Sequence, residues 1–149
     1  MSFEFKILRW ILMLSGSFLM TAFLTVLLPV MTMQAMHEWL GLGEFPVAPI
    51  TDYLARSTSL MYGVHGSIMF YTGLTIQHHW RFIPLLGWLH IVIGTVMVMI
   101  DLTAPMPTYW IVMEGGPIAA VGVLILFLYR KNSPTELNPN AESQLSNHA

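Results

Sequence analysis

The chain has 149 residues, of which 55% are hydrophobic and 9% charged, and its mean hydropathy is +0.64. This composition excludes an ordinary soluble domain and, with 8 Phe, 5 Trp and 5 Tyr among long aliphatic runs, also a disordered chain. The 6 Lys and Arg against 8 Asp and Glu leave no basic surface for nucleic acid, and the lack of cysteine excludes disulfides, thiol chemistry and thiolate metal sites.

Four apolar stretches are long enough to cross a bilayer, whose hydrocarbon core takes about 20 residues of helix. They cover residues 7–29, 51–76, 82–101 and 107–129. The first stretch is too long for the hydrophobic part of a signal peptide, so we expect it to be a span. The sequence therefore predicts an all-α integral membrane protein, with a four-helix bundle formed by a single domain over residues 1–130.

The basic residues predict the orientation of the spans, because Lys and Arg are retained on the cytoplasmic side of membrane segments. If both termini are cytoplasmic, all but one of the basic residues fall on that side: Lys6, Arg9, Arg81, Arg130 and Lys131. Only Arg56 lies elsewhere. We therefore expect a multi-pass protein with both termini in the cytoplasm and a polar cytoplasmic tail over residues 131–149.

A short amphipathic helix is predicted at residues 30–42, between the first two spans. Met33, Met36 and Trp39 recur at helical spacing, and polar side chains occupy the other side. Such a helix is typical of the interface between membrane and water, where its apolar face is buried among the lipids. We expect Gly41 to end it.

Small residues follow a heptad rhythm along the second and third spans. Lipid provides no hydrophobic driving force between helices, so their association depends on close packing. Small residues permit it because they let two backbones approach each other. In the second span the series contains Ser59, Gly63, Gly66 and Gly73, and in the third span it contains Gly87 and Gly94. We call each of these two series of small residues a seam, and we expect the two seams to face one another as antiparallel neighbours.

Three charged residues are expected near the outer face of the membrane, and a fourth, Glu114, about 10 Å inside the last span. The three are Asp52, Arg56 and Asp101. An unpaired charge within a span costs about 2.5–3.5 kcal/mol, so we expect Arg56 to face the bundle and to pair with Glu114 or Asp101. One arginine cannot balance three acids, so at least one carboxyl is left protonated, solvated or bound to a cation. Two interpretations stay open, a buried ion pair that fixes helix packing and a ligand, proton or ion site.

Glu114 is followed directly by Gly115, Gly116 and Pro117. A proline inside a helix removes a backbone donor and clashes with the preceding turn. We therefore expect a kink, or a break into two half-helices, beside this carboxylate. Broken helices next to ionisable residues recur in membrane binding sites.

His65 and His90 lie at similar depths on neighbouring spans, as the two axial ligands of a b-type haem would. Each residue turns a helix by about 100°, so His65 lies on the side of its span opposite Arg56. If the side of Arg56 faces the third span, His65 points away from His90. The simpler interpretation is a buried His90 that is hydrogen-bonded to Ser67 or to the backbone.

Other metal and catalytic motifs are weak. His78 and His79 are adjacent but lack further ligands, which makes an incomplete metal site. The 12 methionines are spread over apolar faces, which indicates packing rather than a copper path. The sequence contains no nucleophile elbow, phosphate loop or zinc helix signature, so it predicts neither an active site nor a bound metal.

Three segments carry a resemblance to other proteins: residues 37–43 (HEWLGLG), 49–59 (PITDYLARSTS) and 99–117 (MIDLTAPMPTYWIVMEGGP). Over most of residues 37–125 the chain resembles a group of uncharacterised small bacterial four-span membrane proteins, and its architecture is loosely similar to the DoxX-like four-helix fold. The resemblance implies the bacterial cytoplasmic (inner) membrane. DoxX-like proteins include partners of membrane redox systems, which implies a small accessory subunit and no particular catalytic residue.

Together these features favour a non-catalytic small integral membrane subunit of a larger bacterial membrane complex, respiratory or photosynthetic. Its partners would be the lipid bilayer and other membrane subunits or copies of itself, met through Trp39, the outward helix faces and the tail. Two alternatives stay open. One is a haem b electron-transfer protein that uses His65 and His90, and the other is a ligand- or proton-binding protein that uses Arg56, Asp101 and Glu114.

Overall fold

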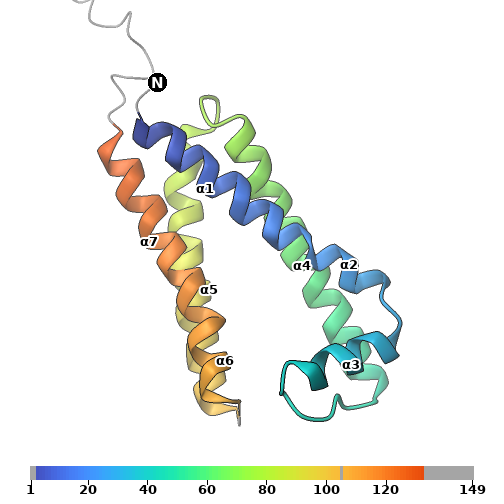
Figure 1. The fold of residues 1–149 in the computed structure, drawn as a ribbon. Coiled ribbons are helices and arrows are strands. Elements are labelled where there is room, and N and C mark those ends of the chain that lie inside the picture. Colours follow the sequence, from blue (N-terminus) through green and yellow to red (C-terminus); the bar gives the residue numbers. More distant parts are fainter. Residues whose placement is uncertain (1–2, 105, 133–149) are drawn as a thin grey trace, which may run out of the picture.

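The computed structural model describes residues 3–104 and 106–132, and within them it contains helices and no strands (Figure 1). The elements are α1 (Phe3–Met20), α2 (Ala22–Leu27), α3 (Val30–Trp39), α4 (Pro49–Leu74), a 3-10 turn η1 (Trp80–Phe82), α5 (Ile83–Thr103), α6 (Thr108–Met113) and α7 (Gly115–Lys131). The all-α class is confirmed. Most of the tail predicted at residues 131–149 lies outside the described residues.

Among the described residues, three helical segments are long and apolar enough to cross a membrane: Phe3–Leu27, Trp80–Thr103 and Thr108–Lys131. The fourth predicted span, α4, has 26 residues, enough for about 39 Å of helix. It carries Asp52, Arg56 and His65, which lower its hydropathy. The chain is thus described as a membrane protein, whereas the complete four-span bundle and the interfacial position of α3 remain predictions.

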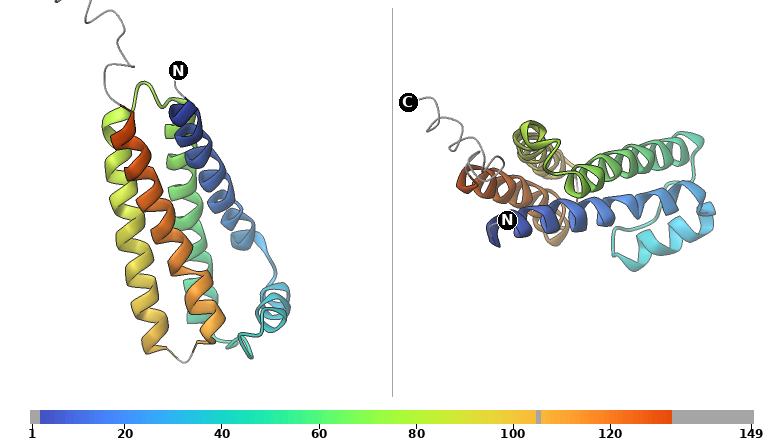
Figure 2. Two further views of the ribbon diagram at one scale, coloured as in Figure 1. Left: turned by 60° about the vertical axis from the view of Figure 1, so that its left-hand side comes forward. Right: turned by 90° about the horizontal axis from the view of Figure 1, so that it is seen from above.

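The helices pack in two pairs. In the first helix pair α1 and α2 lie along α4, and in the second helix pair α6 and α7 lie along α5 (Figure 2). The two pairs come together where α1 meets α7 and diverge toward α3 and α6 (Figure 1). We call the first place the closed end and the second the open end.

Glycines bring the helices of each pair into backbone contact. A Cβ atom on Gly66 would lie 2.7 Å from the carbonyl oxygen of Gly16, and one on Gly94 would lie 2.4 Å from the amide nitrogen of Ala119. Neither distance is tolerable for a side chain. The prediction that the seams of α4 and α5 face one another is therefore wrong. The glycines of α4 face α1 and α2, and those of α5 face α7. A row of glycines fits any helix with a matching groove, so it does not specify its partner.

Aromatic rings hold the two pairs together at the closed end. Trp80 stacks between Phe5 of α1 and Tyr129 of α7, with ring centroids 5.8 Å and 4.8 Å apart. The core continues next to them with fully buried aliphatic side chains: Leu8, Leu12, Met69, Ile83, Leu86 and Ile125. At the open end, a hydrogen bond from the Tyr109 hydroxyl of α6 to the Leu40 carbonyl links the pairs.

The last span breaks at Glu114, as its sequence predicts. Glu114 has φ −91° and ψ −75°, and it stands between α6 and α7. Pro117 consequently falls in the first turn of α7, where a missing N–H breaks no helical hydrogen bond. A second interruption was not predicted. The Thr21 hydroxyl donates to the Phe18 carbonyl (2.6 Å) at the junction of α1 and α2, where it competes with the helical pattern.

The predicted amphipathic segment is a helix over Val30–Trp39. Its end is confirmed at Gly41 and Gly43, whose φ angles of 73° and 88° suit glycine alone. The His37 ring nitrogen Nδ1 lies 3.0 Å from the Gly43 carbonyl oxygen and fastens this turn.

Gly94→Ala tests the close approach in the second helix pair. We expect a loss of about 1–3 kcal/mol in the free energy of unfolding, because the added methyl group meets the backbone of α7. Gly116→Ala is the matched control, since a Cβ there meets no described atom within 4 Å. It should change stability by no more than about 1 kcal/mol, in the stabilising direction. Equal losses for both variants in detergent unfolding would contradict this packing.

Candidate functional site

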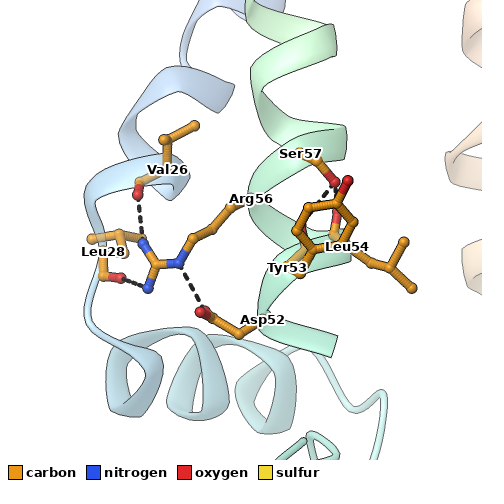
Figure 3. A network of polar contacts seen from close by, with 7 residues as sticks. All are labelled: Val26, Leu28, Asp52, Tyr53, Leu54, Arg56 and Ser57. Atoms are coloured by element: carbon orange, nitrogen blue, oxygen red, sulfur yellow. Dashed lines mark hydrogen bonds and ion pairs between the residues drawn. The ribbon is translucent and has the colours of Figure 1, made fainter. Parts of the chain in front are cut away.

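Arg56 anchors the junction of the first helix pair (Figure 3). Its Nε donates to Asp52 at 2.8 Å, and its two terminal nitrogens donate to the carbonyl oxygens of Val26 and Leu28, the latter at 3.0 Å. Both carbonyls belong to the end of α2, where helical carbonyls lack intrahelical partners. The guanidinium thus caps a helix end through the fork of donors that lysine does not have.

The predicted pairing of Arg56 with Glu114 or Asp101 is wrong. Within the described residues, the ion pair of Arg56 is with Asp52, one turn away on the same helix. The reason is the direction of α4: its Arg56 side faces α1 and α2, whereas Asp101 and Glu114 belong to the second helix pair. The four charged residues therefore divide into two groups with different surroundings.

The second group is acidic and lies toward the open end. Asp101 is only 4% exposed, and its Oδ2 has no hydrogen-bond partner among the described residues. Glu114 receives a hydrogen bond from the Trp110 side chain and lies close enough to Asp101 for their charges to interact. The Tyr62 hydroxyl, 3.9 Å from the sulfur of Met97, lies close enough to both acids for their charges to interact.

The two histidines of the neighbouring spans meet. The ring centroids of His65 and His90 are 5.0 Å apart, with their planes at 37°. The sequence argument placed His65 correctly on the side of α4 opposite Arg56, but it assigned the wrong neighbour to each side. Because the glycine seam of α4 faces α1, the opposite side turns His65 toward α5 and His90.

Their hydrogen bonding leaves nitrogen lone pairs available. His90 is 3% exposed, and its Nδ1 lies 2.9 Å from the Leu86 carbonyl oxygen. A carbonyl only accepts, so Nδ1 carries the hydrogen and Nε2 keeps a free lone pair. The Nε2 atom of His65 is buried and has no hydrogen-bond partner among the described residues. Ser67 is not the partner of His90, because its hydroxyl donates to the Gly63 carbonyl.

Two apolar cavities adjoin the imidazole pair. The smaller, of about 260 Å³, lies between the two helix pairs, with His65 and His90 in its wall. The larger, of about 530 Å³, lies among α1, α6 and α7. Leu19, His90 and Ile118 line both cavities. Glu114 lines the larger one, so His90 and this carboxylate border the same cavity.

Sequence reasoning missed one residue of this region. Met61 lines the smaller cavity, one helical turn before His65 on the same face of α4. The spacing Met61-x-x-x-His65 was a usable signal, but methionine was interpreted as packing. Nowhere in the described part of the chain, this region included, do three His, Asp or Glu side chains gather as a metal site. Of the adjacent histidines His78 and His79, His79 contacts an aromatic side chain, with its ring centroid 5.5 Å from that of Tyr71.

Comparisons with protein-family models, with curated proteins and with solved structures found no match. The resemblance to DoxX-like proteins therefore stays a prediction.

Replacement of Arg56 tests its capping role. Arg56→Leu should lower the free energy of unfolding by about 1.5–3 kcal/mol, because two carbonyls and Asp52 lose a charged donor. Asp52→Asn should cost less than about 1 kcal/mol, because it weakens only a partly exposed ion pair. Hydrogen exchange should speed up in α2 for the arginine variant. Equal costs for the two variants would show that the ion pair, rather than the cap, is what matters.

Proposed function

We propose that this chain is an integral membrane binding protein whose site is the His65–His90 pair. The observation that carries the proposal is the buried, unpartnered Nε2 of His65, in a ring whose centroid lies 5.0 Å from that of His90. A buried polar group without a partner costs about 1–3 kcal/mol. A bound ligand supplies the missing partner and recovers this cost.

The route to the site runs from the open end. The closed end is filled by stacked aromatic rings and buried aliphatic side chains. Polar groups near the histidines come from Tyr62, which lines the smaller cavity, and from Glu114, which lines the larger one. In the predicted orientation the open end faces the outside of the cell, so the ligand enters from the outer face or from the outer leaflet.

A b-type haem held by both histidines fits the spacing less well. Iron-binding imidazoles on opposite faces of a porphyrin have ring centres about 6 Å apart if metal–nitrogen distances are close to the 2.0–2.1 Å of zinc sites. The observed 5.0 Å requires the rings to separate before a haem can enter. A Soret band in haem-replete protein is the result that would favour the haem interpretation.

Membership of a larger membrane complex is a second candidate, favoured by the surface of the open end. Trp39 ends α3 and is 84% exposed, and Met31, at the start of the same helix, is 79% exposed. Such side chains suit a neighbouring subunit as well as lipid. Native purification in mild detergent tests this role. A defined assembly that contains other chains supports it, and recovery only as a free monomer contradicts it.

Native mass spectrometry of protein taken from its own membranes tests the binding proposal. We expect a bound mass that is lost at least tenfold in Ile118→Phe, because Ile118 lines both cavities and a larger ring fills them. Val123→Phe is the matched control on the exposed face of α7 and should retain the bound mass. Wild-type protein without a bound mass, or undiminished binding in Ile118→Phe, would contradict the proposal.

A further inference from the structure

We propose that the ligand of the imidazole pair is one monovalent copper ion, Cu(I), held by His65, His90 and Met61. This inference rests on the proposed binding function and names the chemistry of its ligand. It comes from the spacing of the rings, their protonation, the charge of the cavity wall and the position of the thioether.

The ring spacing matches that of two imidazoles bound to one ion. With metal–nitrogen distances of about 2.0–2.1 Å, the ring centres lie about 5–5.5 Å apart at the angles of three- or four-coordinate sites. On opposite sides of the ion they lie about 6 Å apart. The observed 5.0 Å agrees with the bent arrangement, which leaves room for a third ligand.

The protonation of His90 is already that of a metal ligand. Metal-binding histidines almost always donate their other ring hydrogen to a carbonyl or carboxylate, which fixes the ring and its tautomer. The Nδ1 of His90 does this with the Leu86 carbonyl at 2.9 Å. If His65 also binds through its unpartnered Nε2, both rings bind as neutral imidazoles, and no proton or electron is transferred.

The charge of the wall favours a monovalent ion. The described residues that line the smaller cavity include no carboxylate. Removing a charge from water costs several kcal/mol even after relaxation, and the cost rises with the charge of the ion. Zn²⁺ in this cavity would have no anionic ligand, whereas Cu(I) brings a single charge and prefers soft, neutral ligands.

Met61 provides the soft ligand. It is 66% exposed at the rim of the smaller cavity and lies one helical turn from His65, so both side chains project from the same face of α4. Thioether sulfur selects Cu(I) over harder ions. Met97 is differently placed, because its sulfur faces the Tyr62 hydroxyl at 3.9 Å.

Anaerobic titration of the purified full chain with Cu(I), against a chromophoric Cu(I) chelator, tests the inference. We expect one copper per chain in nanodiscs or mild detergent. His65→Gln should weaken Cu(I) binding by more than about 10–100-fold, because loss of even a second-shell partner commonly costs that much. Since the His65 ring makes no hydrogen bond among the described residues, this variant should still fold. His78→Gln, an exposed histidine, is the matched control and should bind normally.

Met61→Leu tests whether a thioether ligand makes the site prefer Cu(I) to Zn²⁺. We expect it to weaken Cu(I) binding about tenfold, by analogy with second-shell losses, while binding of Zn²⁺ stays unchanged. Met99→Leu is its control, because Met99 is about as exposed as Met61, 62% against 66%, but lines neither cavity. X-ray absorption at the copper edge should report nitrogen and sulfur ligands in the wild type, and nitrogen alone in Met61→Leu.

Three results would overturn the inference. They are the absence of retained copper, copper binding that His65→Gln leaves unchanged, and tighter binding of Zn²⁺ than of Cu(I). Native mass spectrometry distinguishes this failure from failure of the proposed function. An organic mass lost in His65→Gln refutes copper and retains the binding site, whereas the absence of any bound mass refutes both.

Discussion

The structure depends on backbone contact between glycine-lined helices. Gly66 of α4 lies against Gly16 of α1, and Gly94 of α5 lies against α7, each too close for any side chain. Because lipid supplies no hydrophobic drive between helices, these contacts decide which helices pair. Because the glycine side of α4 packs against α1, the opposite side of α4 faces the second helix pair. That side carries His65, and the meeting with His90 follows from it.

Local features could be predicted from the sequence, because their causes are local. The helical spans follow from apolar length, and the break at Glu114 follows from the proline three residues later. The pairing of helices could not be predicted. A glycine seam is complementary to any close helix, and α1 and α7 carry matching glycines of their own at Gly16 and Gly122. Hydropathy and spacing carry no information on that choice.

The predicted ion pair of Arg56 with Glu114 or Asp101 was also wrong because the pairing of helices could not be predicted. Its partners are carbonyls at the end of α2, and these are free only because the first span turns at Leu28, before Pro29. The sequence shows which side chains are carboxylates, but it does not show which backbone carbonyls are left without helical partners. The four charged residues therefore have two different roles. Arg56 with Asp52 holds a helix junction, whereas Glu114 lines the cavity that His90 also borders. The site thus combines two imidazoles in an apolar wall with one carboxylate, Glu114, on the adjoining cavity.

The distance between His65 and His90 tests this account most directly. The chain has no cysteine, so His65→Cys with His90→Cys introduces a single thiol pair without background. The account predicts rapid crosslinking of this pair by a short bifunctional thiol reagent in membranes, within one chain. A thiol pair at Arg56 and His90 should react far more slowly, because Arg56 lies on the other side of α4. The reverse order of rates would contradict the helix pairing and the site built on it.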